Sequence, residues 1–165
     1  MQDPFRLRVL KALTAALEQI TVANGYQFDL TGKVFRGRDA FGDGDPLPLV
    51  SILESVDEKS IGGTSAAFRP GKSIQQSEWE LLVQGFVVDD RDNPTDPGYR
   101  LLADVKKKLA EVRIQKDNIL GFGQKVTDFE FSAGVVRPAD QVSSKTYFWL
   151  KVRMNIVEDH SDPFA

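Results

Sequence analysis

The side chains that can do chemistry in this chain are mostly carboxylates. Cysteine is absent, and His160 is the only histidine. Without cysteine there is no thiolate nucleophile, no cysteine metal site and no disulfide framework. A catalytic triad or a histidine metal site has a single imidazole to work with, and that residue lies in a polar stretch. The sequence therefore favours a solvated surface role for His160 over catalysis.

Aspartates cluster in two stretches that could in principle bind calcium, residues 39–45 (DAFGDGD) and residues 89–96 (DDRDNPTD). Neither stretch has the alternating ligand spacing and the closing glutamate of an EF-hand loop. Aspartate also accepts hydrogen bonds from nearby backbone in turns, and the neighbouring glycines and prolines are typical turn residues. We therefore interpret both stretches as loops and predict no metal site.

Two further patterns are weak candidates for sites. Residues 121–125 (GFGQK) are similar to a phosphate-binding loop, but they follow a predicted helix rather than a strand and lack the full motif. Glu78 and Glu80 share one face of a predicted strand, which solvation or a subunit contact explains. The sequence thus predicts no catalytic residues, no cofactor and no enzyme activity.

Helical periodicity predicts two amphipathic helices. The first begins at Asp3-Pro4 and is closed by Asn24-Gly25, and its apolar stripe is Phe5, Val9, Leu10, Leu13, Leu17 and Ile20. The second begins at Asp96-Pro97, the best helix start in the chain, and runs to about residue 118. Its apolar stripe is Tyr99, Leu102, Val105, Leu109 and Val112, with lysines 106–108 mostly in water.

Strand patterns occupy most of the remaining chain. Residues 34–36 and 49–54 are predicted to pair as a hairpin across an irregular connection rich in Gly, Asp and Pro. Further strands are predicted at 26–30, 77–90, 129–135 and 148–156, the last with almost strict alternation. We therefore expect a single α+β domain over residues 1–165, with an antiparallel (mixed) sheet of about four to five strands and both helices packed on one face.

Residues 57–76 lack periodicity and are rich in Gly, Ser and Lys, which predicts a long flexible loop. Such a loop is either a solvated excursion or an arm that orders on a partner. In the second case Phe68, Arg69 and Lys72 would anchor it. The tail at 158–165 is expected to be frayed.

Composition limits the partners. The net charge of −3 provides no basic surface for binding nucleic acid nonspecifically. The first residues lack the clean apolar core of a signal peptide, and no run approaches the roughly 20 apolar residues that span a membrane. We expect a soluble protein made in the cytoplasm.

The predicted sheet leaves one face without helices. That face carries Trp149 with Tyr147, or the side of the central strand with Leu82, Phe86 and Val88. Exposed apolar patches and open strand edges mark protein–protein surfaces. The residues therefore favour a ring-forming or partner-binding structural protein.

The chain also resembles a known family. Residues 6–13 (RLRVLKAL) and 34–54 (VFRGRDAFGDGDPLPLVSILE) look like tail terminator proteins of tailed bacteriophages, and the layout of the later elements is similar. The resemblance implies an α+β fold and a homohexameric ring that caps the tail tube, stops its polymerisation and provides the surface for head–tail joining. It has no catalytic residues to transfer.

The resemblance further implies the partners and the contacts. These are other copies of the chain, the tail tube protein and a head–tail connector or neck protein, with genomic DNA passing through the lumen without specific binding and no membrane involved. The protein would lie in the virion, at the tail or neck, after synthesis in the cytoplasm of the bacterial host. The 57–76 loop would face the tube or lumen, and the subunit contact would include Phe35, Arg36, Arg38 and Asp39.

Two alternatives stay open. The first is another neck or tail completion protein, such as a head closure or minor tail protein, which the sequence pattern separates poorly from a terminator. The second is a small monomeric enzyme or ligand-binding module with a dispersed site. The mass of the protein in solution discriminates between a ring and a monomer.

Overall fold

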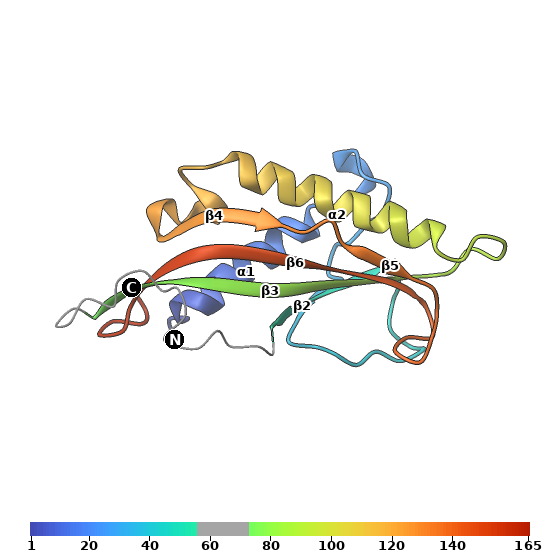
Figure 1. Cartoon of the computed structure of the whole chain (residues 1–165), viewed down its shortest axis with the longest axis horizontal. Helices are drawn as coiled ribbons and strands as arrows, with labels where there is room; N and C mark the ends of the chain where they lie inside the picture. The colour runs from blue at the N-terminus through green and yellow to red at the C-terminus, as the bar shows by residue number, and fades with distance from the viewer. Residues whose placement is uncertain (56–72) are drawn as a thin grey trace.

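The computed structural model describes residues 1–55 and 73–165 of the chain (Figure 1). The helices are α1 (Phe5–Glu18) and α2 (Asp96–Ile114). The strands are β1 (Val34–Arg36), β2 (Leu49–Glu54), β3 (Ile74–Val87), β4 (Val126–Phe131), β5 (Val135–Arg137) and β6 (Thr146–Asp159). Short 3₁₀ turns lie at Val22–Asn24, Ile119–Gly121 and Gly123–Lys125. The fold is α+β with a mixed sheet, as predicted, and the described residues form six strands rather than four or five.

The sheet is built around the long antiparallel pair β3 and β6. These strands of 14 residues pair along their whole length, from Ile74 opposite Asp159 to Val87 opposite Thr146. The strand order is β1-β2-β3-β6-β4, and β5 also pairs with β6. Figure 1 shows β3 and β6 running side by side across the length of the molecule.

Both helices pack on one face of the sheet, as predicted (Figure 1). The stripe residues Phe5, Val9, Leu13 and Leu17 of α1 are buried. In α2 the buried apolar residues are Leu101, Leu102, Val105, Leu109 and Val112. They form one core with the inward residues of the strands, including Trp79, Leu81, Val83, Phe148, Leu150, Val152, Met154 and Ile156. Burial of these stripes fixes the helices on the sheet because each fully buried aliphatic side chain contributes about 1.5–3 kcal/mol.

The helix boundaries differ in detail from the prediction. Helix α2 begins at Asp96 with Pro97 in its first turn, as expected, but it ends at Ile114 rather than near residue 118. Helix α1 ends at Glu18. Asn24 and Gly25 instead close the following 3₁₀ turn, where Gly25 has a φ of 85°, a conformation that glycine adopts without strain. Asp3 forms an ion pair with Lys11 rather than a helix cap.

The predicted strand at 26–30 is wrong. This segment has no strand partner, although Tyr26 and Leu30 are buried. The buried carboxylate of Asp104 in α2 accepts the backbone N–H groups of Gln27 at 2.8 Å and Phe28 at 3.0 Å. A side chain on a helix thus satisfies the backbone donors that a neighbouring strand would otherwise pair.

The predicted hairpin of residues 34–54 is also wrong. The two strands pair, but they are parallel, with Val34 opposite Val50 and Arg36 opposite Ile52. A two-residue turn suits an antiparallel pair, whereas parallel neighbours need a crossover of about a dozen residues. Residues 37–48 provide that length and cross from the end of β1 back to the start of β2.

The last strands also differ from the prediction. The strand predicted at 129–135 is two strands, β4 and β5, separated at Gly134, which has a φ of 83°. Both pair with β6, and β4 has a register irregularity between Thr127 and Glu130.

The predicted loop at 57–76 is too long, because β3 begins at Ile74. Phe68, Arg69 and Lys72 lie outside the described residues. The tail predicted to fray at 158–165 begins inside β6, which ends at Asp159. Further along the tail, the carbonyl of Pro163 accepts the backbone N–H of Phe5. The two ends of the described chain therefore lie side by side.

Candidate interaction surface on the outer face of the sheet

The face of the sheet that points away from α1 and α2, here called the outer face, has its own apolar cluster. Leu49 of β2, Phe86 of β3 and Tyr147 of β6 are buried there, and four partly buried residues pack against them: Phe35, Phe41, Leu47 and Trp149. Because side chains alternate along a strand, each of the long strands contributes to the helix-covered core on one face and to this cluster on the other.

Five aromatic rings form a row across the outer face, here called the aromatic row: Phe35, Phe41, Phe86, Tyr147 and Trp149. Successive ring centroids are separated by 6.1, 5.1, 6.1 and 6.0 Å. The row follows from strand register, because Phe86 and Tyr147 are direct partners across β3 and β6. Trp149 lies two residues further along the same face of β6. Such pairs stabilise by about 0.5–1.5 kcal/mol beyond their buried area.

The crossover 37–48 lies over the sheet and contributes Phe41 to the row. Arg38 fixes it, because its guanidinium lies 5.0 Å from the ring centre of Phe35 and 4.7 Å from that of Phe41. Arg38 Nη2 also donates to Asp45 Oδ1 at 2.6 Å. Asp45 Oδ2 accepts the backbone N–H of Gly42 at 2.8 Å, and these hydrogen bonds, the one from Gly42 first, lower the pKa of the Asp45 carboxyl.

A second loop, residues 138–145, borders the same surface. Asp140 organises it by accepting the backbone N–H of Val142 at 2.8 Å and the hydroxyl of Tyr147 at 2.9 Å. The hydrogen bond from Val142 is the main reason that the pKa of Asp140 lies below its ordinary value. Burial, followed by the hydrogen bond to Asp140, raises the pKa of Tyr147.

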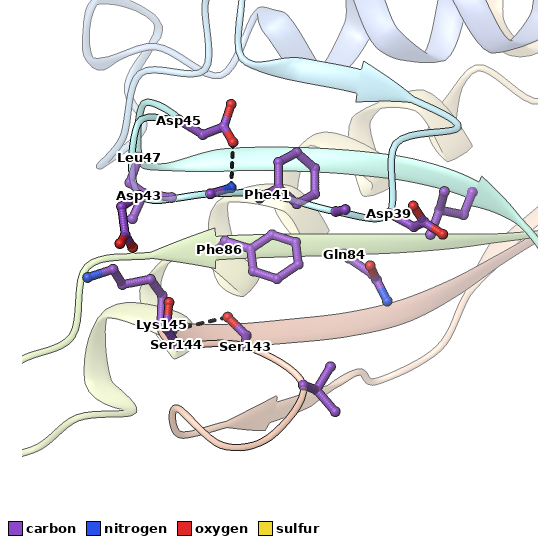
Figure 2. A pocket seen from close by; sticks show the side chains of 14 residues that line it. Asp39, Phe41, Asp43, Asp45, Leu47, Gln84, Phe86, Ser143, Ser144 and Lys145 are labelled. Carbon is purple, nitrogen blue, oxygen red and sulfur yellow. Dashed lines mark hydrogen bonds between the residues drawn. The ribbon is translucent and has the colours of Figure 1, made fainter.

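A pocket of about 380 Å³ lies between the two loops. Its apolar lining is Phe41, Leu47, Leu53, Phe86 and Val142, and its charged lining is Asp39, Asp43, Asp45 and Lys145. Figure 2 shows the rings of Phe41 and Phe86 in the middle of the pocket, with Asp39 on one side and Asp43 and Lys145 on the other. The pocket therefore offers an apolar floor with charges around it.

The other half of the outer face is polar. Lys151 pairs with Glu80 at 3.1 Å, and Arg153 pairs with Glu130 at 2.8 Å. Asn155 Nδ2 donates to Asp128 at 2.6 Å. These cross-strand pairs are partly or fully exposed and contribute little to stability. The apolar part of the outer face is therefore the half with the aromatic row and the pocket.

Four of the eight interaction residues predicted from the sequence lie on this surface, and three others, Phe68, Arg69 and Lys72, lie outside the described residues. Phe35 and Trp149 stand at the two ends of the aromatic row, Arg38 stacks on it and Asp39 borders the pocket. Arg36 does not belong there. It points to the helix-covered side of the sheet and donates to Thr14 Oγ1 of α1 at 2.9 Å, because it is one residue out of phase with Phe35.

The sequence left open whether the helix-free face carries Trp149 with Tyr147 or Leu82 with Phe86. Both sets lie on the same face, since β3 and β6 pair with Phe86 opposite Tyr147. Val88, named with the second set, lies beyond the end of β3 and is 58% exposed. The two alternatives are therefore two halves of one surface.

Sequence reasoning missed Phe41 and Asp140 as parts of this surface. Phe41 is a lone aromatic residue in a Gly- and Asp-rich loop, where no periodicity indicates which way it points. Asp140 has a local signal, because its carboxylate accepts N–H groups two and three residues ahead, as turn aspartates do.

The chain was compared with protein families and with curated proteins. No protein-family model matches this chain, and no curated protein matches it in sequence. Among the described residues, no helix is long and apolar enough to cross a membrane. Nor does that part of the chain hold three or more His, Cys, Asp or Glu side chains grouped to bind a metal ion.

Proposed function

We propose that this protein is a structural subunit of a bacteriophage tail, a tail terminator that assembles into a homohexameric ring through the outer face of its sheet. The observation that carries the proposal is the aromatic row, which ends in the partly exposed Trp149. The resemblance of residues 34–54 supports it, because that segment contributes Phe35, Arg38 and Phe41 to the row.

The composition of the outer face is that of a contact surface. Phe35, Phe41, Leu47, Leu53 and Trp149 are all partly exposed around the buried residues Leu49, Phe86 and Tyr147. Aromatic residues and arginine are enriched in the centres of protein interfaces, and they dominate binding energies. The polar pairs at the other half of the face would form the rim of such a contact.

The sheet edges favour association through a face rather than by strand addition. The outermost strands of the sheet are β1 and β5, with only three residues each, and β4, whose pairing is interrupted between Thr127 and Glu130. Short or irregular edge strands are poor templates for pairing with another chain. A subunit contact that uses the broad outer face is consistent with these short or irregular edges.

In the proposed role, the ring sits on the end of the tail tube and stops its polymerisation. One surface of the ring contacts the tail tube protein, and another contacts a connector or neck protein during head–tail joining. Genomic DNA passes through the lumen, and the net charge of −3 is compatible with passage without specific binding. A head closure or minor tail protein would use the same outer face for a different neighbour in the neck.

The pocket favours a second candidate, a monomeric ligand-binding module. Its volume of about 380 Å³ lies in the range of small-molecule sites. In this case the aromatic row would be the wall of a binding site rather than part of a subunit contact.

Light scattering coupled to size exclusion, at several concentrations and with negative-stain images of the same fractions, tests the proposal. We expect rings of about six copies for the wild type and loss of the rings in Trp149→Ser. Lys151→Ser is the matched control, because Lys151 lies on the same face of β6 but in the polar half. A chain that stays monomeric at every concentration would favour the ligand-binding module instead.

A further inference from the structure

The pocket contains charges that the described structure leaves unpaired. Asp39 is exposed at the pocket margin and forms no salt bridge with any residue that the structure describes. Lys145, the one cation among the described residues that line the pocket, lies on the far side of Phe86 from Asp39 (Figure 2). The Asp39 side of the pocket therefore combines an aromatic floor with an available carboxylate.

The same loop already shows how such a combination holds a guanidinium. Arg38 stacks on Phe35 and Phe41 while its guanidinium pairs with Asp45. A planar guanidinium suits both contacts at once, because it stacks on aromatic faces and donates to a carboxylate in its plane. Phe86, Phe41 and Asp39 offer the same two kinds of group to a second arginine.

The exposed surface of α2 provides a matching cation. Arg100 lies in the first turns of α2, is exposed, and forms no salt bridge within residues 1–55 and 73–165. Its charge lowers the pKa of nearby Asp90 from a distance, as a smaller contribution after the hydrogen bonds from Asn93 and Asp92. Tyr99 beside it is 60% exposed, so this part of the helix offers an aromatic ring together with the guanidinium.

We infer that the pocket receives Arg100 of a second copy of the chain, with the guanidinium against Asp39 and Tyr99 packed at the pocket margin. This inference rests on the proposed function and specifies one contact of the ring. It commits to a second copy because the charges are complementary: Arg100 is an exposed cation without a salt bridge among the described residues, and three aspartates and one lysine line the pocket, where only Asp45 of these aspartates is paired, with Arg38.

The positions of the two surfaces suit a ring. Helix α2 lies on one side of the sheet, and the crossover 37–48 lies on the other (Figure 1). One copy therefore cannot fill its own pocket with Arg100, and a contact between the two surfaces is head-to-tail. Head-to-tail contacts form closed rings when the rotation between neighbours closes, whereas a self-complementary patch gives only a dimer.

Charge reversal tests the contact. Asp39→Arg and Arg100→Asp are each made in the full chain, and association is followed by analytical ultracentrifugation for each variant alone and for their equimolar mixture. We expect each variant alone to associate at least about tenfold more weakly than the wild type, since losing one charged pair costs on the order of a factor of ten or more. The mixture restores association when copies of the two variants alternate. The introduced carboxylate of one variant then meets the introduced guanidinium of the other at one contact, and the native pair forms at the next.

Two control variants separate this contact from general charge effects. Lys116→Asp and Asp117→Arg change exposed charges beyond the other end of α2, and they should leave association unchanged. At a concentration where the wild type is dissociated, thermal unfolding of all variants should match the wild type, because the four side chains are exposed.

The outcomes distinguish this contact from the proposed function. A wild type that assembles while both charge-reversed variants assemble equally well overturns the Arg100 contact and leaves the ring standing. Two weakened variants that fail to recover in the mixture also overturn the contact. A wild type that never associates overturns both.

Discussion

Arg38 Nη2 donates to Asp45 Oδ1 at 2.6 Å, and this bond closes the crossover that joins the parallel strands β1 and β2. The carbonyl of Arg38 also accepts a hydrogen bond from the buried hydroxyl of Ser51 in β2. One hydrogen bond therefore lies within the loop and the other joins the loop to the sheet. The loop places Phe41 against Phe86. The shape of the pocket depends on these contacts, because the same loop forms one of its walls.

The first prediction concerns the pH dependence of the stability that the contacts of Asp45 give to this loop. The pKa of Asp45 is lower in the folded protein than in the unfolded chain, first because of the Gly42 N–H and then because of Arg38. Its contribution to stability is therefore present above the unfolded pKa of about 3.9, and it is lost as the pH falls through the folded pKa. Asp45→Asn should remove this contribution, so urea midpoints should fall less steeply below about pH 4 in the variant than in the wild type. Parallel curves would contradict this role for Asp45.

The second prediction concerns the close approach of β3 to Phe148. A Cβ built on Gly85 would lie 2.0 Å from Cε1 of Phe148, inside the core. Gly85→Ala should therefore lower the free energy of unfolding by about 3 kcal/mol, at the upper end of overpacking effects. Gly42→Ala is the control, since nothing lies within 4 Å of its Cβ position. Urea unfolding of both variants provides the measurement.

A double-mutant cycle checks the cause of the Gly85 effect. Phe148→Leu removes the ring that the new methyl group would meet, so Gly85→Ala should cost less in that background than in the wild type. Equal costs in both backgrounds would place the strain elsewhere than at Phe148.

Most positions of the elements with strong periodicity were predicted correctly, although Tyr99, predicted in the apolar stripe of α2, is 60% exposed. The Phe5, Val9, Leu13 and Leu17 stripe is buried as expected, and Asp96-Pro97 begins α2. The inward residues of β6 alternate as predicted, because a strand covered on one face by helices must place every second side chain in the core. These predictions succeed because they depend only on local spacing.

Pairing between strands could not be predicted in the same way. The direction of β2 relative to β1 depends on where the 37–48 connection runs, and its Gly, Asp and Pro residues indicate a loop of either kind. The aromatic row depends on the register between β3 and β6, which pairs Phe86 with Tyr147 although the two residues are far apart in the sequence. Trp149 and Asp39 were placed on a contact surface by the sequence, but the pocket that lies beside this row was not.

The third prediction concerns Asp104, whose role was hidden by the wrong strand at 26–30. Its buried carboxylate accepts two backbone N–H groups, from Gln27 and Phe28. Asp104→Ala leaves both donors unpaired and should lower the free energy of unfolding by about 3 kcal/mol. Asp104→Asn should cost less, because the amide oxygen still accepts a hydrogen bond. Hydrogen exchange should show faster exchange at Gln27 and Phe28 in the alanine variant, and unchanged exchange there would contradict the assignment.

The fourth prediction uses the two tryptophans as reporters of assembly. Trp79 is 4% exposed in the helix-covered core, whereas Trp149 is partly exposed at the end of the aromatic row. If the outer face is the subunit contact, acrylamide quenching of Trp149 should fall as the protein concentration rises through assembly. Quenching of Trp79 should stay low throughout, because folding alone already buries it.

Single-tryptophan variants separate the two signals. Trp79→Phe leaves Trp149 as the only indole, and this change removes no hydrogen bond, because the buried Nε1 of Trp79 has no acceptor among the described residues. Trp149→Phe leaves Trp79 and keeps an aromatic ring in the row. We expect concentration-dependent protection only in the Trp79→Phe variant. Assembly without any change in the quenching of Trp149 would show that the subunits meet through another surface, and the aromatic row would then be free for a different partner.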